Sequence, residues 1–198
     1  MVAQGLQLPV NIAFAPTQSS LPTAPKFYIT ELYGTIKVVT NSGLIANYAT
    51  NVINYTPSGA FPGSGEQGLA GIAVDPVTND VFVSHLWQTN GSTFPRITRY
   101  SSINGGLSAS SSQVILDMPG ESQGQSHQIS KLEIVNGELF CHMGDGLQVN
   151  TAQNLNSYRG KILRLNLDGT PIPSNPGYNG GTVNARDFIY CAGVRNPF

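Results

Sequence analysis

Short apolar runs recur at a fixed spacing in this chain. The run IAFAP at residues 12–16 aligns with IAVDP at 72–76 and then with LEIVN at 132–136, so each step is 60 residues. A repeat of this length, with each copy built from short apolar runs, is typical of propeller blades or of another repeat array. The spacing predicts that the chain is part of a larger closed object made of similar units.

Each repeat carries the signals of four β-strands, and helical periodicity is nearly absent. Short apolar or β-branched runs are bounded by Gly, Pro, Asn and Asp, which favour turns. The predicted strands cover residues 10–15, 26–31, 35–40, 44–49, 69–74, 80–86, 95–101, 112–117, 128–135, 138–143, 160–167 and 186–191. Four strands in meander order make one blade of a β-propeller. We therefore predict an all-β fold of four-stranded antiparallel blades at about 7–50, 66–118 and 127–192, with the start of a fourth blade at 195–198.

Three blades cannot close a ring. An open array would leave apolar blade faces uncovered at both ends and would leave the ring-closing strand unpaired. We expect the missing part of the propeller to come from a further stretch of chain or from a second copy of this one.

The composition excludes some classes of partner. Charged residues make up 11% of the 198 residues, against about 25% in an average globular protein, and the net charge is −1. This balance gives no reason to expect nucleic acid or an anionic membrane as a partner. No run approaches the ~20 apolar residues of a membrane-spanning helix. Residues 1–5 lack the pattern of a signal peptide, so we expect either a cytosolic chain or one whose leader is absent from this sequence.

The two cysteines give little information about function. Cys141 and Cys191 fall on different, non-adjacent predicted strands of the third repeat. A disulfide is one interpretation, and two buried free thiols are the favoured one. No spacing of Cys and His suggests a zinc site, and we expect no metal ligand within these residues.

One predicted hairpin brings an imidazole and a carboxylate to the same end of a sheet. Asn136-Gly137 is the strongest two-residue turn signal in the chain, and pairing outward from it places His127 opposite Gly146, beside Asp145. A carboxylate on one ring nitrogen fixes the tautomer and leaves the other nitrogen as a base. The sequence therefore predicts a candidate acid–base pair at this end of the third repeat.

Polar residues of neighbouring repeats are expected at the same end. Glu66 lies at the start of a strand in the second repeat, and Arg195-Asn196 follow the last strand of the third and should return toward the propeller axis. Each also has a structural interpretation. His127 with Asp145 could be a satisfied pair, Glu66 could cap a strand end, and Arg195 could anchor a turn.

Two further histidines have weaker claims. His85 and Trp87 lie at a strand end of the second repeat, where His85 either lines the site or bonds a loop carbonyl. His142 alternates with Cys141 along a predicted strand, which favours sheet packing.

Five phrases of this sequence resemble a known family in order and in spacing. They are GEQGLAGIA at 65–73, HQ at 127–128, MGDG at 143–146, GKILRLNLDG at 160–169 and GVRNPF at 193–198. Together they resemble the glucose/sorbosone dehydrogenases, and among these the soluble aldose sugar dehydrogenases that use pyrroloquinoline quinone (PQQ) and calcium. The resemblance covers the N-terminal half of a family member.

The resemblance implies a fold, an activity and a role for each matched residue. It implies a six-bladed parent in which a sugar is oxidised to its lactone by hydride transfer to PQQ. His127 matches the general base and Asp145 the acid that orients it. Arg195 and Asn196 match polar residues that lie against the cofactor, and Glu66 falls where quinone-binding members can carry a polar amide.

The same resemblance sets expectations about what lies outside these residues. The calcium ligands and further basic residues that grip the quinone are expected beyond residue 198, so we expect residues 1–198 to be inactive by themselves. Family members are typically exported, which implies a secreted or periplasmic protein. The alternative is a non-catalytic extracellular β-propeller that serves as a binding or interaction module.

Overall fold

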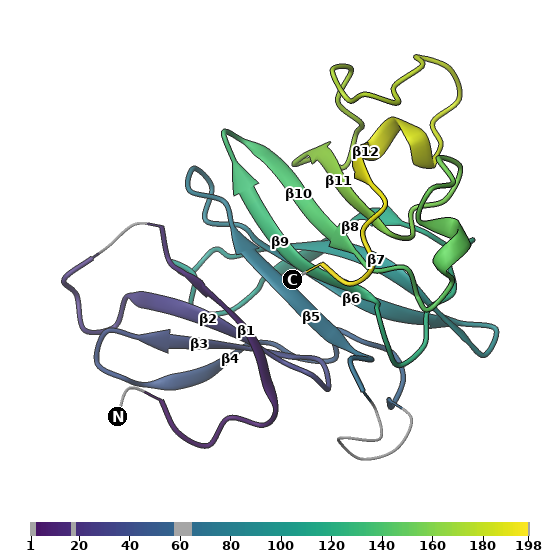
Figure 1. The fold of residues 1–198 in the computed structure, drawn as a ribbon. Coiled ribbons are helices and arrows are strands. Elements are labelled where there is room, and N and C mark those ends of the chain that lie inside the picture. The colour runs from purple at the N-terminus through teal and green to yellow at the C-terminus, as the bar shows by residue number, and fades with distance from the viewer. Residues whose placement is uncertain (1–2, 17–18, 58–64, 198) are drawn as a thin grey trace.

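The computed structural model describes residues 3–16, 19–57 and 65–197, which form three antiparallel sheets of four strands each (Figure 1). The first sheet contains β1 (Pro9–Phe14), β2 (Pro25–Glu31), β3 (Thr35–Thr40) and β4 (Ile45–Ala49). The second contains β5 (Leu69–Val74), β6 (Val81–Thr89), β7 (Ser92–Ser101) and β8 (Ser111–Asp117). The third contains β9 (Ile129–Val135), β10 (Glu138–Met143), β11 (Lys161–Asn166) and β12 (Ile189–Ala192). Every predicted strand overlaps one of these, so the predicted all-β class is confirmed.

The first strands of the three sheets lie side by side around a common space. Hydrogen bonding within each sheet follows chain order, which leaves β1, β5 and β9 each at one edge. β5 contacts both β1 and β9, and Figure 1 shows the three strands adjacent at the centre of the view. A groove along them is lined by residues 11–13, 72–74 and 131–135. Sheets arranged in this way around an axis are blades of a β-propeller.

Two tight hairpins set the register of the second and third blades. Asn90 and Gly91 have φ values of 51° and 77°, and Asn136 and Gly137 have 52° and 79°. Positive φ at both central residues is the geometry that matches the right-handed twist of paired strands. The first of these turns was missed in the sequence, where the polar residues 88–92 were not assigned to strands. They pair as a hairpin and extend β6 and β7 beyond the predicted 80–86 and 95–101.

The apolar core fills the spaces between blades. One buried cluster joins the first blade to the second, and another joins the second to the third. The inner strands approach closely because Gly71 of β5 faces β9: a Cβ on Gly71 would lie 2.2 Å from Ser130 O and 2.9 Å from Leu132 N. No larger residue fits there without separating the blades.

The last strand begins later than predicted. The sequence predicts a strand over 186–191, whereas the structure has a 3₁₀ turn, η2 (Ala185–Phe188), before β12. The Asn184 side chain accepts from Arg186 N (3.1 Å), and the Asp187 carboxylate accepts from Asn184 N (2.9 Å). This reciprocal cap satisfies the backbone locally, which competes with strand pairing.

Both cysteines are free thiols, as favoured from the sequence, but only one is buried. Cys141 lies in the core on β10, whereas Cys191 on the edge strand β12 is exposed. The expectation of two buried thiols is therefore wrong for Cys191, because β12 pairs with only one neighbour among the described strands.

No helix in residues 3–16, 19–57 or 65–197 is long and apolar enough to cross a membrane.

Candidate functional site

The site lies at the open end of the β9–β10 hairpin, opposite its turn. The register shifts by one residue before β10 ends. Beyond this shift, Gly144 N donates to Gln128 O (3.1 Å) and Gly146 N donates to His127 O (2.9 Å). The prediction that His127 faces Gly146 is confirmed. Asp145, between the two paired glycines, is the extra residue that compensates the shift, and this turns its side chain toward His127.

Hydrogen bonds join all five residues that the sequence patterns indicated. His127 Nδ1 lies 2.7 Å from Asp145 Oδ1, and His127 N donates to Glu66 Oε2 (2.8 Å). Asn196 Nδ2 donates to the other Glu66 oxygen (3.1 Å), and Asp145 N donates to Arg195 O (2.8 Å). Because Arg195 and Asn196 are consecutive, these bonds close a ring. We call it the site ring.

The imidazole in this ring is held firmly and has one nitrogen free. Asp145 is buried, and its Oδ1 also accepts from Leu147 N (2.9 Å), so the carboxylate has a fixed orientation. The His127 side chain is 10% exposed. With Nδ1 committed to the carboxylate, Nε2 is the nitrogen without a hydrogen bond to any described residue. This is the arrangement of an oriented base.

The backbone at His127 is strained. Its φ is +52°, a left-handed value that costs a non-glycine residue about 1–2 kcal/mol. Strain of this kind persists where surrounding contacts overdetermine it, and it is concentrated at functional sites. Here the amide is fixed by Glu66 and the carbonyl by Gly146 N.

Glu66, at the start of the second blade, is hydrogen-bonded to residues at both ends of the third blade. Its own N–H donates to Gln125 O (2.7 Å), while its carboxylate receives the His127 N–H and the Asn196 amide. The preceding Gly65 has φ +57°, and a Cβ there would lie 2.3 Å from Gln125 O. A glycine is therefore required for the chain to pass this close.

A cavity of about 600 Å³ adjoins the site ring. It lies between the starts of the inner strands, and its lining is mostly apolar, with Glu66, Gln128 and Ser130 among the polar residues. The imidazole of His127 is not part of the lining. The Gln128 Oε1 and Asn196 Oδ1 atoms are buried and have no hydrogen-bond partner among the described residues. Buried carbonyl oxygens of this kind are ready to accept from a ligand that carries hydroxyl or N–H donors.

A family model described as Glucose / Sorbosone dehydrogenase matches residues 6–198. The chain belongs to this family. The resemblance drawn from the five phrases is therefore confirmed.

Solved structures named as glucose dehydrogenases and aldose sugar dehydrogenases share the fold. One from Thermus thermophilus, named as an oxidoreductase (glucose dehydrogenase), has 28% identity and a TM-score of 0.77, over 98% of this chain and 54% of that one. The PQQ-bound aldose sugar dehydrogenase from Streptomyces coelicolor has 26% identity and a TM-score of 0.66, over 88% and 49%. The apo soluble aldose sugar dehydrogenase from Escherichia coli has 20% identity and a TM-score of 0.67, over 96% and 52%.

This member of the family spans about half the length of those solved structures. No curated protein matches the chain.

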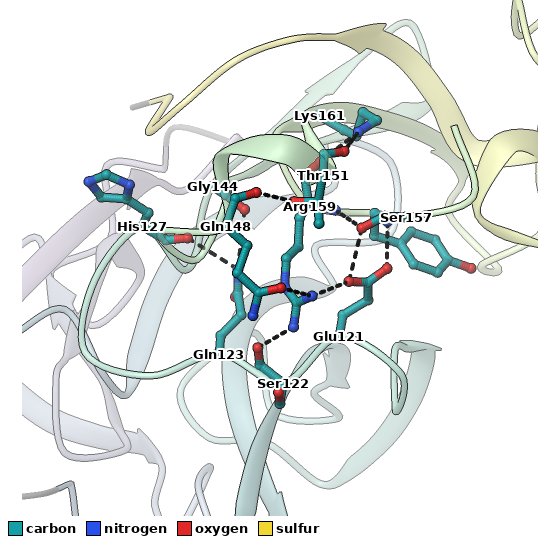
Figure 2. A network of polar contacts seen from close by, with 11 residues as sticks. Glu121, Ser122, Gln123, His127, Gly144, Gln148, Thr151, Ser157, Arg159 and Lys161 are labelled. Atoms are coloured by element: carbon teal, nitrogen blue, oxygen red, sulfur yellow. Dashed lines mark hydrogen bonds and ion pairs between the residues drawn. The ribbon is translucent and has the colours of Figure 1, made fainter. Parts of the chain in front are cut away.

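A buried ion pair behind the site was not foreseen from the sequence. Arg159 Nη1 lies 3.2 Å from Glu121 Oε2 and donates to Gln148 Oε1 (3.1 Å), as Figure 2 shows. Glu121 also accepts from Ser157 Oγ (3.0 Å) and Tyr158 N (2.8 Å). These bonds tie the loop before β9 to the loop between β10 and β11.

Lys161, within the family phrase at 160–169, has a structural role. Its Nζ donates to three carbonyl oxygens, those of Thr151 (2.9 Å), Ala152 (2.9 Å) and Arg159 (2.6 Å), and the residue is fully buried. Burial lowers the pKa of this ammonium group. It closes the loop that returns to β11 and does not face the cavity.

The side chains of Arg195 and His85 have very different surroundings. The Arg195 residue is exposed, and its guanidinium makes no ion pair with a described residue. His85 is buried in β6 between Leu86 O (3.1 Å) and Thr98 Oγ1 (2.9 Å), and burial lowers its pKa to about 4. His85 does bond a carbonyl, but that carbonyl belongs to Leu86 within β6 and not to a loop as expected, and His85 does not line the cavity.

His142 lies half-buried within β10, where burial lowers its pKa. Among the residues described, no group of three or more His, Cys, Asp and Glu is placed to hold a metal ion.

Proposed function

We propose that this chain is the N-terminal part of a PQQ-dependent sugar dehydrogenase that oxidises the anomeric hydroxyl of an aldose to the lactone. The observation that carries the proposal is the His127–Asp145 pair, which lies in the site ring beside a large cavity. Membership of the glucose/sorbosone dehydrogenase family and the PQQ-bound relative support it.

In this proposal, His127 Nε2 takes the proton of the sugar hydroxyl. As the O–H bond breaks, its electrons form the C=O double bond of the lactone, and the hydrogen on C1 leaves as hydride. The Asp145 carboxylate holds the ring through Nδ1 and stabilises the imidazolium that forms. Bound PQQ would supply the acceptor for that hydride.

The residues present fit one part of a binding site for PQQ, which is a quinone with several carboxylates. The exposed Arg195 guanidinium offers a cation for a carboxylate or for a developing negative oxygen. Asn196 is fixed by Glu66 through its amide nitrogen, which leaves its buried Oδ1 as an unused acceptor. We assign Glu66, Arg195 and Asn196 to cofactor binding.

Further parts of the cofactor site are expected outside residues 1–198. We propose that calcium ligands and additional basic residues lie there, and that residues 1–198 are inactive without them. We also propose an exported protein, secreted or periplasmic, because this is the usual location in the resembling family.

The test uses the full-length protein that contains this chain. It is incubated with PQQ and calcium, and dye reduction is measured with a panel of aldoses. We expect sugar-dependent reduction in the wild type and a loss of about 10³–10⁴-fold in Asp145→Asn, because the amide favours the wrong imidazole tautomer. Failure to bind PQQ, with no reduction by any sugar, would overturn the proposal in favour of a non-catalytic binding propeller.

A further inference from the structure

A buried glutamine touches both sides of the His127–Asp145 pair. Gln123 is 4% exposed. Its Nε2 donates to His127 O (3.1 Å) and to Gly144 O (3.2 Å), and its Oε1 accepts from Ile129 N (2.8 Å). Figure 2 shows the side chain reaching the His127 carbonyl from below. Both donors of the amide are thus used on the backbone that carries the pair.

The two carbonyls that Gln123 bonds lie on either side of the His127–Asp145 contact in the chain. His127 has the strained backbone, and its carbonyl direction is set by the bond from Gln123 together with the bond from Gly146 N. Gly144 directly precedes Asp145, so its carbonyl fixes the chain on the acid side. One amide therefore links the backbone on the imidazole side to the backbone on the carboxylate side.

Gln123 is itself anchored to two blades. Its N–H donates to Thr93 O (2.9 Å) on β7, and the Thr93 hydroxyl donates to Gln123 O. The neighbouring Ser122 carbonyl accepts from Arg159, which is paired with the buried Glu121. Bonds from the second blade and from Arg159 thus fix the backbone of the segment that carries the glutamine.

We propose that Gln123 is the positioning residue for the base: it holds the imidazole of His127 at hydrogen-bond distance from Asp145. The catalytic meaning of this role rests on the proposed function. The geometric part does not, because it concerns the imidazole and the carboxylate alone.

The test compares Gln123→Glu with wild type. The carboxylate keeps an acceptor for Ile129 N but loses both donors and faces two carbonyl oxygens. The matched control is Gln125→Glu, two residues away and exposed, which adds the same charge near the site. The readout is the imidazole Nδ1 proton of His127, which is observed by nitrogen-edited NMR in the full-length protein without cofactor.

We expect a slowly exchanging Nδ1 proton in the wild type and in Q125E, and its loss in Q123E. A folded Q123E with an unchanged Nδ1 proton would overturn the proposal. In the full-length enzyme, Q123E should lower kcat about 10²-fold, as expected for a misplaced base. If the wild type shows no PQQ-dependent activity, the proposed function fails, while the NMR comparison still decides the role of Gln123.

A milder variant covers the case in which Q123E does not fold. Thr93→Val removes the hydroxyl that donates to Gln123 O and accepts from Gln67 Nε2 (3.5 Å), and it keeps the backbone contact of Thr93. Loss of the hydrogen bond to Gln123 O, worth about 1 kcal/mol, should speed exchange of the Nδ1 proton by about fivefold. Unchanged exchange in T93V would count against the proposal as directly as an unchanged Q123E.

Discussion

Replacing Gly144 by alanine tests the close contact that sets His127 against Asp145. A Cβ on Gly144 would lie 2.2 Å from His127 O, 2.4 Å from its carbonyl carbon and 2.8 Å from its Cα. Non-bonded carbon contacts are favourable at about 3.5 Å, so the two segments must separate by about 1 Å. All three neighbours are backbone atoms, and no side-chain rotation can relieve the clash.

The cost follows from the bonds that this separation breaks. A displacement of about 1 Å takes the bond from Gly144 N to Gln128 O (3.1 Å) and the His127–Asp145 bond (2.7 Å) beyond the usual limit of about 3.2 Å. Two lost hydrogen bonds at about 1 kcal/mol each, with about 1–3 kcal/mol for overpacking, give about 3–5 kcal/mol. Each kcal/mol lowers Tm by about 2–4 °C in a chain of this size, so we expect a fall of about 6–20 °C.

Thermal unfolding followed by circular dichroism measures this difference. The control is Gly124→Ala in the loop before β9, where an added Cβ meets nothing within 4 Å. We expect the control to change stability by no more than about 0.5 kcal/mol. Equal midpoints for G144A and G124A would refute the reasoning.

Two further predictions concern buried charges away from the reacting atoms. Arg159→Met should lower the free energy of unfolding by about 3–5 kcal/mol in denaturant titrations, because it leaves the Glu121 carboxylate buried without its partner; a loss below about 1 kcal/mol would show that the ion pair is not needed. Burial lowers the pKa of His85 from 6.5 to about 4. Between pH 4 and pH 6.5 the unfolded chain is therefore protonated at His85, whereas the native chain is not. Stability should therefore be full above pH 6.5 and fall by about 3 kcal/mol as the pH drops to about 4, and His85→Gln should show a smaller fall; identical pH profiles for the two proteins would contradict this assignment.

The sequence predicted the local features of the site well. Asn136-Gly137 determined the hairpin, and counting outward from the turn brought His127 to Gly146 even though the register shifts in between. The register shifts by one residue within the paired strands, and Asp145 is an extra residue that shifts it back. The two shifts cancel, so a simple count from the turn gives the correct partner for His127. Short strands and turns are encoded by neighbouring residues, which is why all the strands were found within a few residues of their ends.

Contacts between blades were not predictable in the same way. Glu66 was expected near the site, but nothing local indicates that its carboxylate receives the backbone N–H of His127. Gln123 and the Glu121–Arg159 pair lie in long polar loops, where many residues of the same type are solvated. Which of them become buried depends on how the loops of two blades meet, and that is set by tertiary packing rather than by neighbours in the sequence.

His85 shows the opposite error. Its place at a strand end made it a candidate for the site, yet the extended β6–β7 hairpin carries the strand past it and buries it beside Thr98. Recognising Asn90-Gly91 as a turn would have lengthened both strands and removed His85 from consideration.

The most direct test of the account is a single-turnover measurement on the full-length protein loaded with PQQ. The His127→Gln variant and the wild type are mixed with an aldose, and with the same aldose deuterated at C1, and the reduction of the bound quinone is followed by absorbance. We predict that both proteins bind PQQ, that the wild type shows a deuterium isotope effect, and that the variant reduces the quinone at least about 10³-fold more slowly. Equal rates in the two proteins would contradict the claim that the imidazole of the site ring is the base.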